Sequence, residues 1–149
     1  MEILPVMDIS GSALSAERLR MDVIANNVAN ANMTRGPDGG PYRRKEVVFQ
    51  PRNDFDRLLW LHMPGSIEIS GVGQGVRVRG VVEDARPFRR VYDPGHPDAN
   101  ADGYVLYPNF NVVEEMVDMI SATRAYQANL SVIQSAKDMA LQSLTLLQG

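Results

Sequence analysis

The chain has 149 residues, of which 44% are hydrophobic and 22% charged, as in an ordinary globular protein. It has no cysteine, which excludes a disulfide scaffold, a cysteine-bound metal and a thiol nucleophile. It has only two histidines, and these are far apart in the sequence. The net charge of −3 disfavours a nucleic-acid binder, because such proteins are basic as a rule.

The N-terminus lacks the basic start and long apolar core of a cleaved secretory signal, so we expect none. No apolar run reaches the length of about 18 residues that a membrane-spanning helix needs. The sequence therefore predicts a chain without a secretory signal and without a bilayer-spanning segment.

The N-terminal region has the apolar periodicity of a helix from about Ser10 to Asn32. Leu14, Met21 and Val28 recur every seven residues, and Ile24 lies on the same face. An asparagine-rich stretch followed by Gly36 and Pro37 predicts the end of this helix.

The middle of the chain is rich in glycine and proline and reads as short antiparallel strands joined by glycine turns. Strands are expected within 42–49, 76–82 and 89–92. The stretch 54–63 fits either a short helix or a loop.

A longer C-terminal helix is expected from Asn111, as its N-cap, to Gln148. At 1.5 Å per residue it would be about 57 Å long. Two seven-residue series form an apolar seam typical of coiled coils. The first is Val112, Met119, Tyr126, Ile133, Ala140 and Leu147, and the companion series is Met116, Thr123, Leu130, Lys137 and Leu144.

These patterns predict an α+β protein, with long N- and C-terminal helices packed as a coiled coil. A small β-rich middle domain lies between the two helices in the sequence. The expected divisions are an N-terminal helical arm at 1–34, a middle domain at 35–108 with an insert near 52–75, and the C-terminal helix at 109–149. The C-terminal helix would outrun its shorter partner by 15 residues, about 22 Å. Exposed apolar side chains on that overhang point to a structural subunit completed by an assembly partner.

Two local motifs suggest small-ligand sites. Residues 98–103, Asp-Ala-Asn-Ala-Asp-Gly, match the start of an EF-hand calcium loop. Asn109 occupies the position of the bidentate glutamate, however, and Pro94 and Pro97 oppose an incoming helix. A small calcium-binding regulatory module therefore stands as the alternative function. The glycine-rich run 71–75 is followed by a strand pattern, so a hairpin tip is favoured over a nucleotide loop.

Enzymatic chemistry has little support, because no nucleophile and base are visibly paired. We expect no catalytic, cofactor-binding or metal-binding residues, no cofactor, no nucleic acid and no small-molecule substrate. The basic residues of the middle region alternate with acids, which favours a solvated or subunit-facing surface. A helical adaptor outside any larger machine is a further alternative that the central turn motifs disfavour.

The two ends of the chain resemble the bacterial flagellar rod and hook family. Residues 12–20 and 23–32 are similar to the N-terminal signature of that family, and residues 103–105, 108–109, 111–120 and 124–129 to its C-terminal signature. Residues 36–43, 47–49 and 92–100 resemble the proximal-rod branch. The resemblance covers nearly the whole chain and weakens between 52 and 75.

The resemblance implies a structural subunit of the flagellar basal-body proximal rod. Such subunits form a helical drive shaft that transmits torque from the motor to the hook. It also implies export by the flagellar type III apparatus, a place in the periplasm-spanning rod, self-association, and contacts with other rod proteins, membrane-ring components and the export-gate junction.

The predicted site residues fall into two groups. Those expected to pack within and between subunits are Leu14, Met21, Ile24, Val28, Met116, Met119, Tyr126, Leu130, Ile133, Leu144 and Leu147. Those of the family motif are Asn26, Asn27, Asn30, Arg124 and Asn129. The asparagines are expected either to form hydrogen bonds between subunits or to end the helix.

Overall fold

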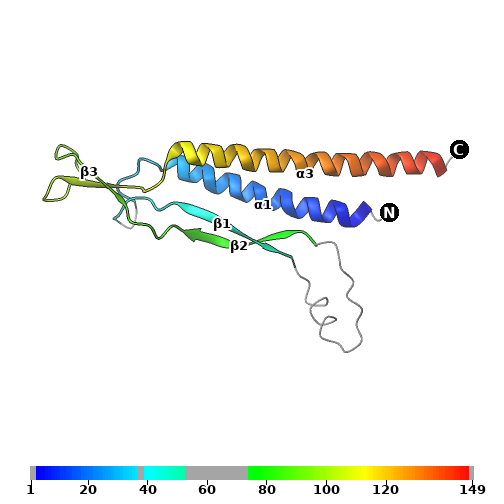
Figure 1. The fold of residues 1–149 in the computed structure, drawn as a ribbon, viewed down its shortest axis with the longest axis horizontal. Coiled ribbons are helices and arrows are strands. Elements are labelled where there is room, and N and C mark those ends of the chain that lie inside the picture. Colours follow the sequence, from blue (N-terminus) through cyan, green and yellow to red (C-terminus); the bar gives the residue numbers. More distant parts are fainter. Residues whose placement is uncertain (1–2, 37–38, 53–73, 148–149) are drawn as a thin grey trace, which may run out of the picture. The chain divides into compact units, whose positions relative to one another are not determined.

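The computed structural model describes residues 3–36, 39–52 and 74–147. In chain order it contains α1 (Ile3–Ala29), β1 (Lys45–Pro51), β2 (Val76–Glu83), β3 (Arg89–Tyr92), β4 (Tyr104–Tyr107) and α3 (Val112–Leu147) (Figure 1). Long helices at the two ends of the chain and short strands between them confirm the α+β class. The predictions for the insert near 52–75, for 54–63 and for the glycine run 71–75 lie mostly outside the described residues.

Helix α1 begins at Ile3 rather than near Ser10, so the predicted start was wrong. Pro5 does not prevent this, because a proline in the first turn replaces an amide that has no partner within the helix. At the other end, the amide of Asn30 donates to the carbonyls of Asn26 (3.1 Å) and Asn27 (3.2 Å), and the helix stops at Ala29.

Helix α3 begins where the sequence predicts. The amide of Val113 donates to Asn111 Oδ1 (3.0 Å), which confirms Asn111 as the N-cap. Glu114 and Glu115 in the first turn complement the positive end of the helix dipole. With 36 residues in α3 and 27 in α1, the difference is nine residues, about 14 Å, rather than 15 residues. The overhang was overestimated because α1 starts earlier than expected.

The strands form two separate two-stranded sheets, β1–β2 and β3–β4. The first is closed at its two ends by the amide of Asp84, which donates to the carbonyl of Arg44 (2.8 Å), and by the amide of Arg52, which donates to Gly75 (3.0 Å). These pairings run in opposite directions along the chain, so the β1–β2 ribbon is antiparallel, as predicted.

The second sheet is an antiparallel hairpin in which Val91 faces Val105 and Tyr92 faces Tyr104. Val105 is fully buried, and the rings of Tyr92 and Tyr104 lie 5.3 Å apart, edge to face. Gly103 adopts a φ of 77° just before β4. Strand β4 was missed in the sequence because four residues after an Asp/Asn/Gly run carry too little periodicity.

The chain divides into two compact units, and each takes a section of α1, of the β1–β2 ribbon and of α3. Unit 1 comprises the described residues within Met1–Arg18, Phe49–Arg79 and Arg124–Gly149. Unit 2 comprises those within Leu19–Val48 and Gly80–Thr123, including the β3–β4 hairpin. The three-part division expected from the sequence stays a prediction.

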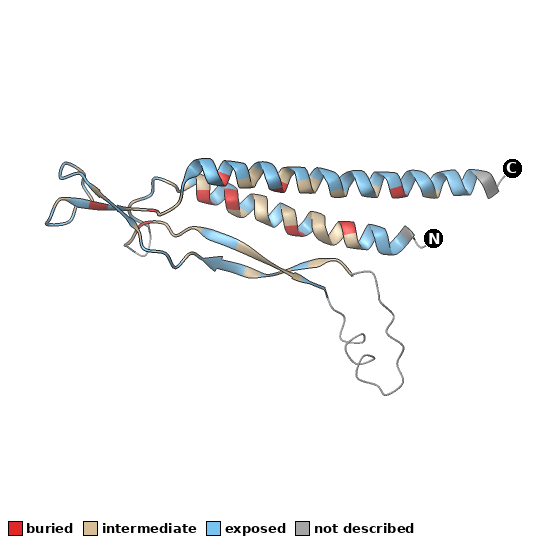
Figure 2. Cartoon of the chain, in the orientation of Figure 1, coloured by how far each residue is buried: buried red, intermediate tan, exposed pale blue. Residues whose placement is uncertain are grey.

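Buried side chains on the helices are mostly small. Ala16, Ala122 and Ala136 are buried, and Ile24 is the large apolar residue among the buried helical positions that the structure describes (Figure 2). Alanine allows two helices to approach closely, so this pattern is typical of helices in tight contact. None of the described helices is long and apolar enough to cross a membrane.

In unit 1 the ribbon meets α1 at Gly75. The amide of Val76 donates to Ser12 Oγ (3.0 Å), and that hydroxyl donates to the carbonyl of Ile9 (2.7 Å). Gly75 has a φ of 99°, and a Cβ at this position would collide with Ser12 Oγ. Only glycine combines this backbone conformation with so close an approach.

Candidate functional site

A buried polar cluster joins α1, the start of β1 and α3 within unit 2. Its centre is Asn27 on α1, which is 0% exposed, and its carboxylate is Glu115 on α3, which is 1% exposed. Asn27 Nδ2 donates to Glu115 Oε2 (2.8 Å) and to the carbonyl of Lys45 (2.8 Å). Asn27 Oδ1 accepts from the amide of Lys45 (3.0 Å) and from the hydroxyl of Tyr42 (3.0 Å).

These four hydrogen bonds use both donors and both acceptor positions of the Asn27 amide. Two of them go to the amide and carbonyl of Lys45, so the side chain serves β1 as a short neighbouring strand would. A fully buried amide is tolerated only when it is paired in this way. Asn27 therefore fixes where β1 lies against α1.

Arg44 completes the cluster from the β1 side. Its Nε lies 2.5 Å from Glu115 Oε1, its Nη2 lies 3.2 Å from Asp118 Oδ2, and its Nη1 lies 3.5 Å from Glu46 Oε2. Burial alone would lower the pKa of Arg44, but the hydrogen bond and the charge of Glu115, with Glu46 and Asp118, raise it. The guanidinium stays charged, and Glu115 has both a charged and an amide partner.

The phenol of Tyr42 is held in its neutral form. Burial, and then the negative charges of Glu115 and Glu83, raise the pKa of Tyr42 above its ordinary value of 10.0. The protonated hydroxyl is the form that can donate to Asn27. Every group in the cluster is satisfied by another, so the arrangement serves to hold three chain segments together rather than to bind or convert a ligand.

The structure places the predicted packing residues of α1 on its inner face. Ile24 is buried, and Leu14, Met21 and Val28 are half-buried. Within unit 2, Met21 Sδ lies 3.6 Å from Thr123 Oγ1 of α3, within hydrogen-bond distance for sulfur. The sections of α1 and α3 in this unit therefore lie side by side.

On α3 most residues of the two predicted series differ in exposure, except that Val112 of the first series is exposed and Thr123 of the companion series is half-buried. Met119, Tyr126 and Ile133 of the first series are half-buried. Met116, Leu130 and Leu144 of the companion series are exposed. The side chain of Leu147 lies outside the described residues.

Met116 and Leu130, which were expected to pack within or between subunits, are therefore exposed in the single chain, and their packing stays a prediction. The buried companion series lies one position earlier, at Glu115, Ala122 and Ala136, with Asn129 half-buried between the last two. The physical reason is the cluster itself, because Glu115 must face Asn27 and Arg44 and so turns Met116 away. A role for the exposed residues in contacts between subunits remains a prediction.

The predicted family-motif residues differ in whether their side chains bond within one helix or to other segments of the chain. Asn30 Nδ2 donates back to the carbonyl of Asn26 (2.8 Å) and to its Oδ1 (2.7 Å), which closes the end of α1. In unit 1, Asn129 Nδ2 donates to the carbonyl of Ala125 (2.9 Å), and Arg124 is exposed. Among these five residues, and within the part of the chain that the structure describes, Asn27 is the one with side-chain hydrogen bonds to other segments.

Sequence patterns did not indicate Glu115 and Tyr42 as partners of Asn27, or Arg44 as the partner of Glu115. One signal was present: Asn27 lies three residues after Ile24 and one before Val28, on the apolar face of α1. A polar residue inside an apolar stripe needs a buried partner. That partner is 88 residues away in sequence, beyond the reach of local patterns.

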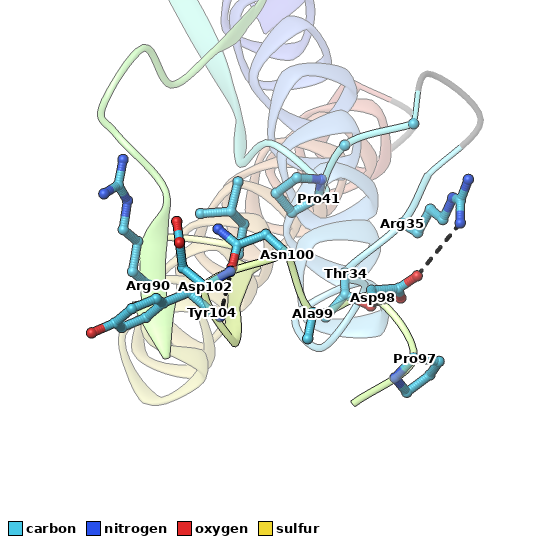
Figure 3. A pocket seen from close by; sticks show the side chains of 13 residues that line it. Thr34, Arg35, Pro41, Arg90, Pro97, Asp98, Ala99, Asn100, Asp102 and Tyr104 are labelled. Atoms are coloured by element: carbon cyan, nitrogen blue, oxygen red, sulfur yellow. Dashed lines mark hydrogen bonds and ion pairs between the residues drawn. The ribbon is translucent and has the colours of Figure 1, made fainter. Parts of the chain in front are cut away.

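The EF-hand-like loop lines a hollow of about 630 Å³ in unit 2 (Figure 3). The side-chain oxygens of Asp98 and Asn100 are already engaged: Asp98 Oδ2 accepts from Thr34 Oγ1 (2.8 Å), and Asn100 Oδ1 accepts from the amides of Asp102 (3.0 Å) and Tyr104 (2.8 Å). Across the described ranges, no three Asp, Glu or His side chains gather in a way that could hold a metal ion. Nothing here supports the calcium-binding alternative.

Comparison with known protein families gives one match at each end of the chain. The family "Flagella basal body rod protein" matches residues 7–37, and "Flagellar basal body rod FlgEFG protein C-terminal" matches residues 101–146. These two regions carry Asn27 and Glu115, respectively.

Whole-chain relatives are named "Flagellar basal-body rod protein FlgC". The protein of that name from Borreliella burgdorferi is 46% identical over the full length of both chains. The one from Salmonella typhimurium is 47% identical over 98% of each chain, and the one from Bacillus subtilis is 42% identical over 94% of this chain and 95% of its own.

Proposed function

Because the chain belongs to the FlgC family and is a structural subunit of the flagellar basal-body rod, we propose how it assembles there. Its terminal helices pack as a coiled coil, and subunits stack through these helices into the proximal part of the rod. The stack acts as a drive shaft that carries torque from the motor towards the hook.

The observation that carries this proposal is the exposed apolar series on α3. Met116, Leu130 and Leu144 lie fourteen residues apart, at every second position of the companion series, and are exposed in the single chain. Large apolar side chains at such a spacing are typical of a helix that packs on a second partner. A neighbouring rod subunit supplies that partner in the assembly.

The contact between subunits is heterologous, because the covered and uncovered faces of α3 differ. A heterologous contact repeats without closing after two copies and generates a helical stack. Many such contacts in parallel suit a shaft under torque better than one tight site. The proposed partners are other rod proteins, further copies of this chain, membrane-ring components and the export-gate junction.

We propose no enzymatic activity, cofactor, nucleic acid or small-molecule substrate for the chain. Its proposed route to the periplasm-spanning rod is the flagellar type III apparatus, without a cleaved signal peptide. Arg124 is exposed and Asn129 half-buried on α3, which suits a role for Arg124 in contacts between subunits.

Electron microscopy of basal bodies from cells that lack the gene tests the proposal. We expect membrane rings without a rod, and recovery of the rod when the wild-type gene is returned. Tyr126→Asp places a charge on the half-buried seam and should lower incorporation into basal bodies at least about tenfold, with export unchanged. Gln127→Asp changes the exposed neighbouring position and is the matched control. An intact rod and hook in the deletion strain would contradict the proposal.

A further inference from the structure

The outward side of α3 carries an apolar face near the start of the helix. Val113, Met116, Val117 and Ile120 follow the i, i+3, i+4, i+7 spacing of one helix face, and each is between 53% and 63% exposed. At 100° per residue, Val113 lies about 180° around the helix from the buried Ala122. This outward apolar face is therefore opposite the side that α1 covers in unit 2.

The same side of α3 is polar further along the helix. In unit 1 the exposed residues at matching helical angles include Ser131, Gln134, Ser135, Asp138 and Gln142. An exposed helix face that contacts only solvent is mostly polar, and this side of α3 is mostly polar in unit 1, where Leu141 is its exposed apolar residue. The apolar stretch in unit 2 therefore indicates a docking surface.

The chain itself offers a complementary element at the start of α1. Leu4 is 80% exposed, and Met7, one turn later, is also exposed. The first turn of α1 has no acidic residue to offset the positive end of its helix dipole. Beside the outward apolar face, Glu114 is exposed, and its charge is among those that raise the pKa of Arg86, although no direct ion pair joins the two side chains.

We infer that the first turns of α1 from a second copy of this chain dock on the outward apolar face of α3, with the helix end next to Glu114. Within unit 2 the chain's own α1 already contacts the opposite side of α3 through Asn27 and Met21. The contact joins two different surfaces, so it repeats from copy to copy. This inference rests on the proposed assembly and names the surfaces that one of its contacts uses.

The size of the surface indicates a contact that forms in the assembly rather than in dilute solution. Four side chains on one helix and two on the other fall well short of the 20–30 residues a side that a stable protein–protein interface of about 1,600 Å² uses. The subunit therefore stays unpaired until neighbouring copies are held in place. Neighbouring contacts then raise the effective concentration of the docking helix.

Disulfide cross-linking tests the contact cleanly, because the chain has no cysteine of its own. Leu4→Cys and Val117→Cys are expressed together in cells that lack the wild-type gene, and isolated basal bodies are oxidised. We expect a covalent dimer at least about tenfold more abundant than from Leu4→Cys with Ser131→Cys, which is exposed on the polar part of the same side. Equal yields from the two pairs, or a larger yield from Val117→Cys alone, would overturn the inference.

The cross-linking result is separable from the proposed function. If the wild-type chain is absent from basal bodies, the proposed function itself fails. If Val117→Cys enters the rod but forms no dimer with Leu4→Cys, only the docking inference fails. As a second measurement, Val117→Asp should lower incorporation at least about tenfold with helical circular dichroism unchanged, and Ser131→Asp should not. Normal incorporation of Val117→Asp would also overturn the inference.

Discussion

Unit 1 and unit 2 contain the same three components, yet they hold the β1–β2 ribbon in different ways. In unit 2, Asn27 and Arg44 connect the ribbon to both helices through buried hydrogen bonds and an ion pair with Glu115. In unit 1, the ribbon is attached to α1 by the hydrogen bond from Val76 to Ser12 and by an exposed ion pair between Asp8 and Arg52 (3.5 Å).

The difference shows how buried polar groups fix an arrangement of helices. A shift of any member of the cluster in unit 2 away from its partners would leave a buried polar group or charge unpaired, which costs free energy. One relative position of α1, β1 and α3 is therefore favoured over all others. The exposed ion pair in unit 1 contributes at most about 1 kcal/mol, so the fit of Gly75 against Ser12 matters more there.

The largest expected effect comes from removing the carboxylate at the centre of unit 2. Glu115→Ala leaves Arg44 without its closest partner and Asn27 with an unpaired donor. We expect the free energy of unfolding to fall by about 3–5 kcal/mol, measured by urea unfolding followed by circular dichroism. Glu114→Ala alters the exposed neighbour and should cost no more than about 1 kcal/mol, from its weaker interaction with the helix dipole. Equal effects of the two substitutions would show that the cluster does not hold unit 2.

A smaller effect is expected in unit 1. Gly75→Ala forces an alanine to a φ of 99° and places its Cβ against Ser12 Oγ. We expect a local loss of about 1–3 kcal/mol, seen as faster hydrogen exchange at the amide of Val76. Gly80→Ala is the control, because a Cβ there meets no atom within 4 Å. Unchanged exchange in the Gly75 variant would contradict the close fit described for this unit.

The smallest effect concerns the hydrogen bond from Tyr42 to Asn27. Tyr42→Phe should lower the free energy of unfolding by about 0.5–1.5 kcal/mol at neutral pH. The pKa of Tyr42 is raised on folding, so its contribution is complete below the unfolded value near 10.0 and disappears as pH rises through the folded value.

The two proteins should therefore converge in stability in alkaline solution. Unfolding curves of wild type and Tyr42→Phe, collected from pH 7 to above pH 10, measure this convergence. A constant difference across that range would mean that the hydroxyl does not act as a hydrogen-bond donor in the cluster.

Local patterns in the sequence were sufficient for most of the elements. Asn111 was predicted as the N-cap of α3, and the valine-rich runs were predicted as strands in β1, β2 and β3. Such features depend on neighbours a few residues apart, which the sequence displays directly. The predicted start of α1 near Ser10 was wrong, because the helix extends to Ile3 and its first turn accommodates Pro5.

The sequence by itself determined the fold class, the two long helices and the family, because periodicity and contiguous motifs carry them. Only the tertiary structure decided which face of α3 is buried. Shifting the buried series by one residue, from Met116 to Glu115, cannot be read from apolar spacing alone. It follows from the requirement that Asn27, Arg44 and Glu115, far apart in the chain, satisfy one another's hydrogen bonds out of water.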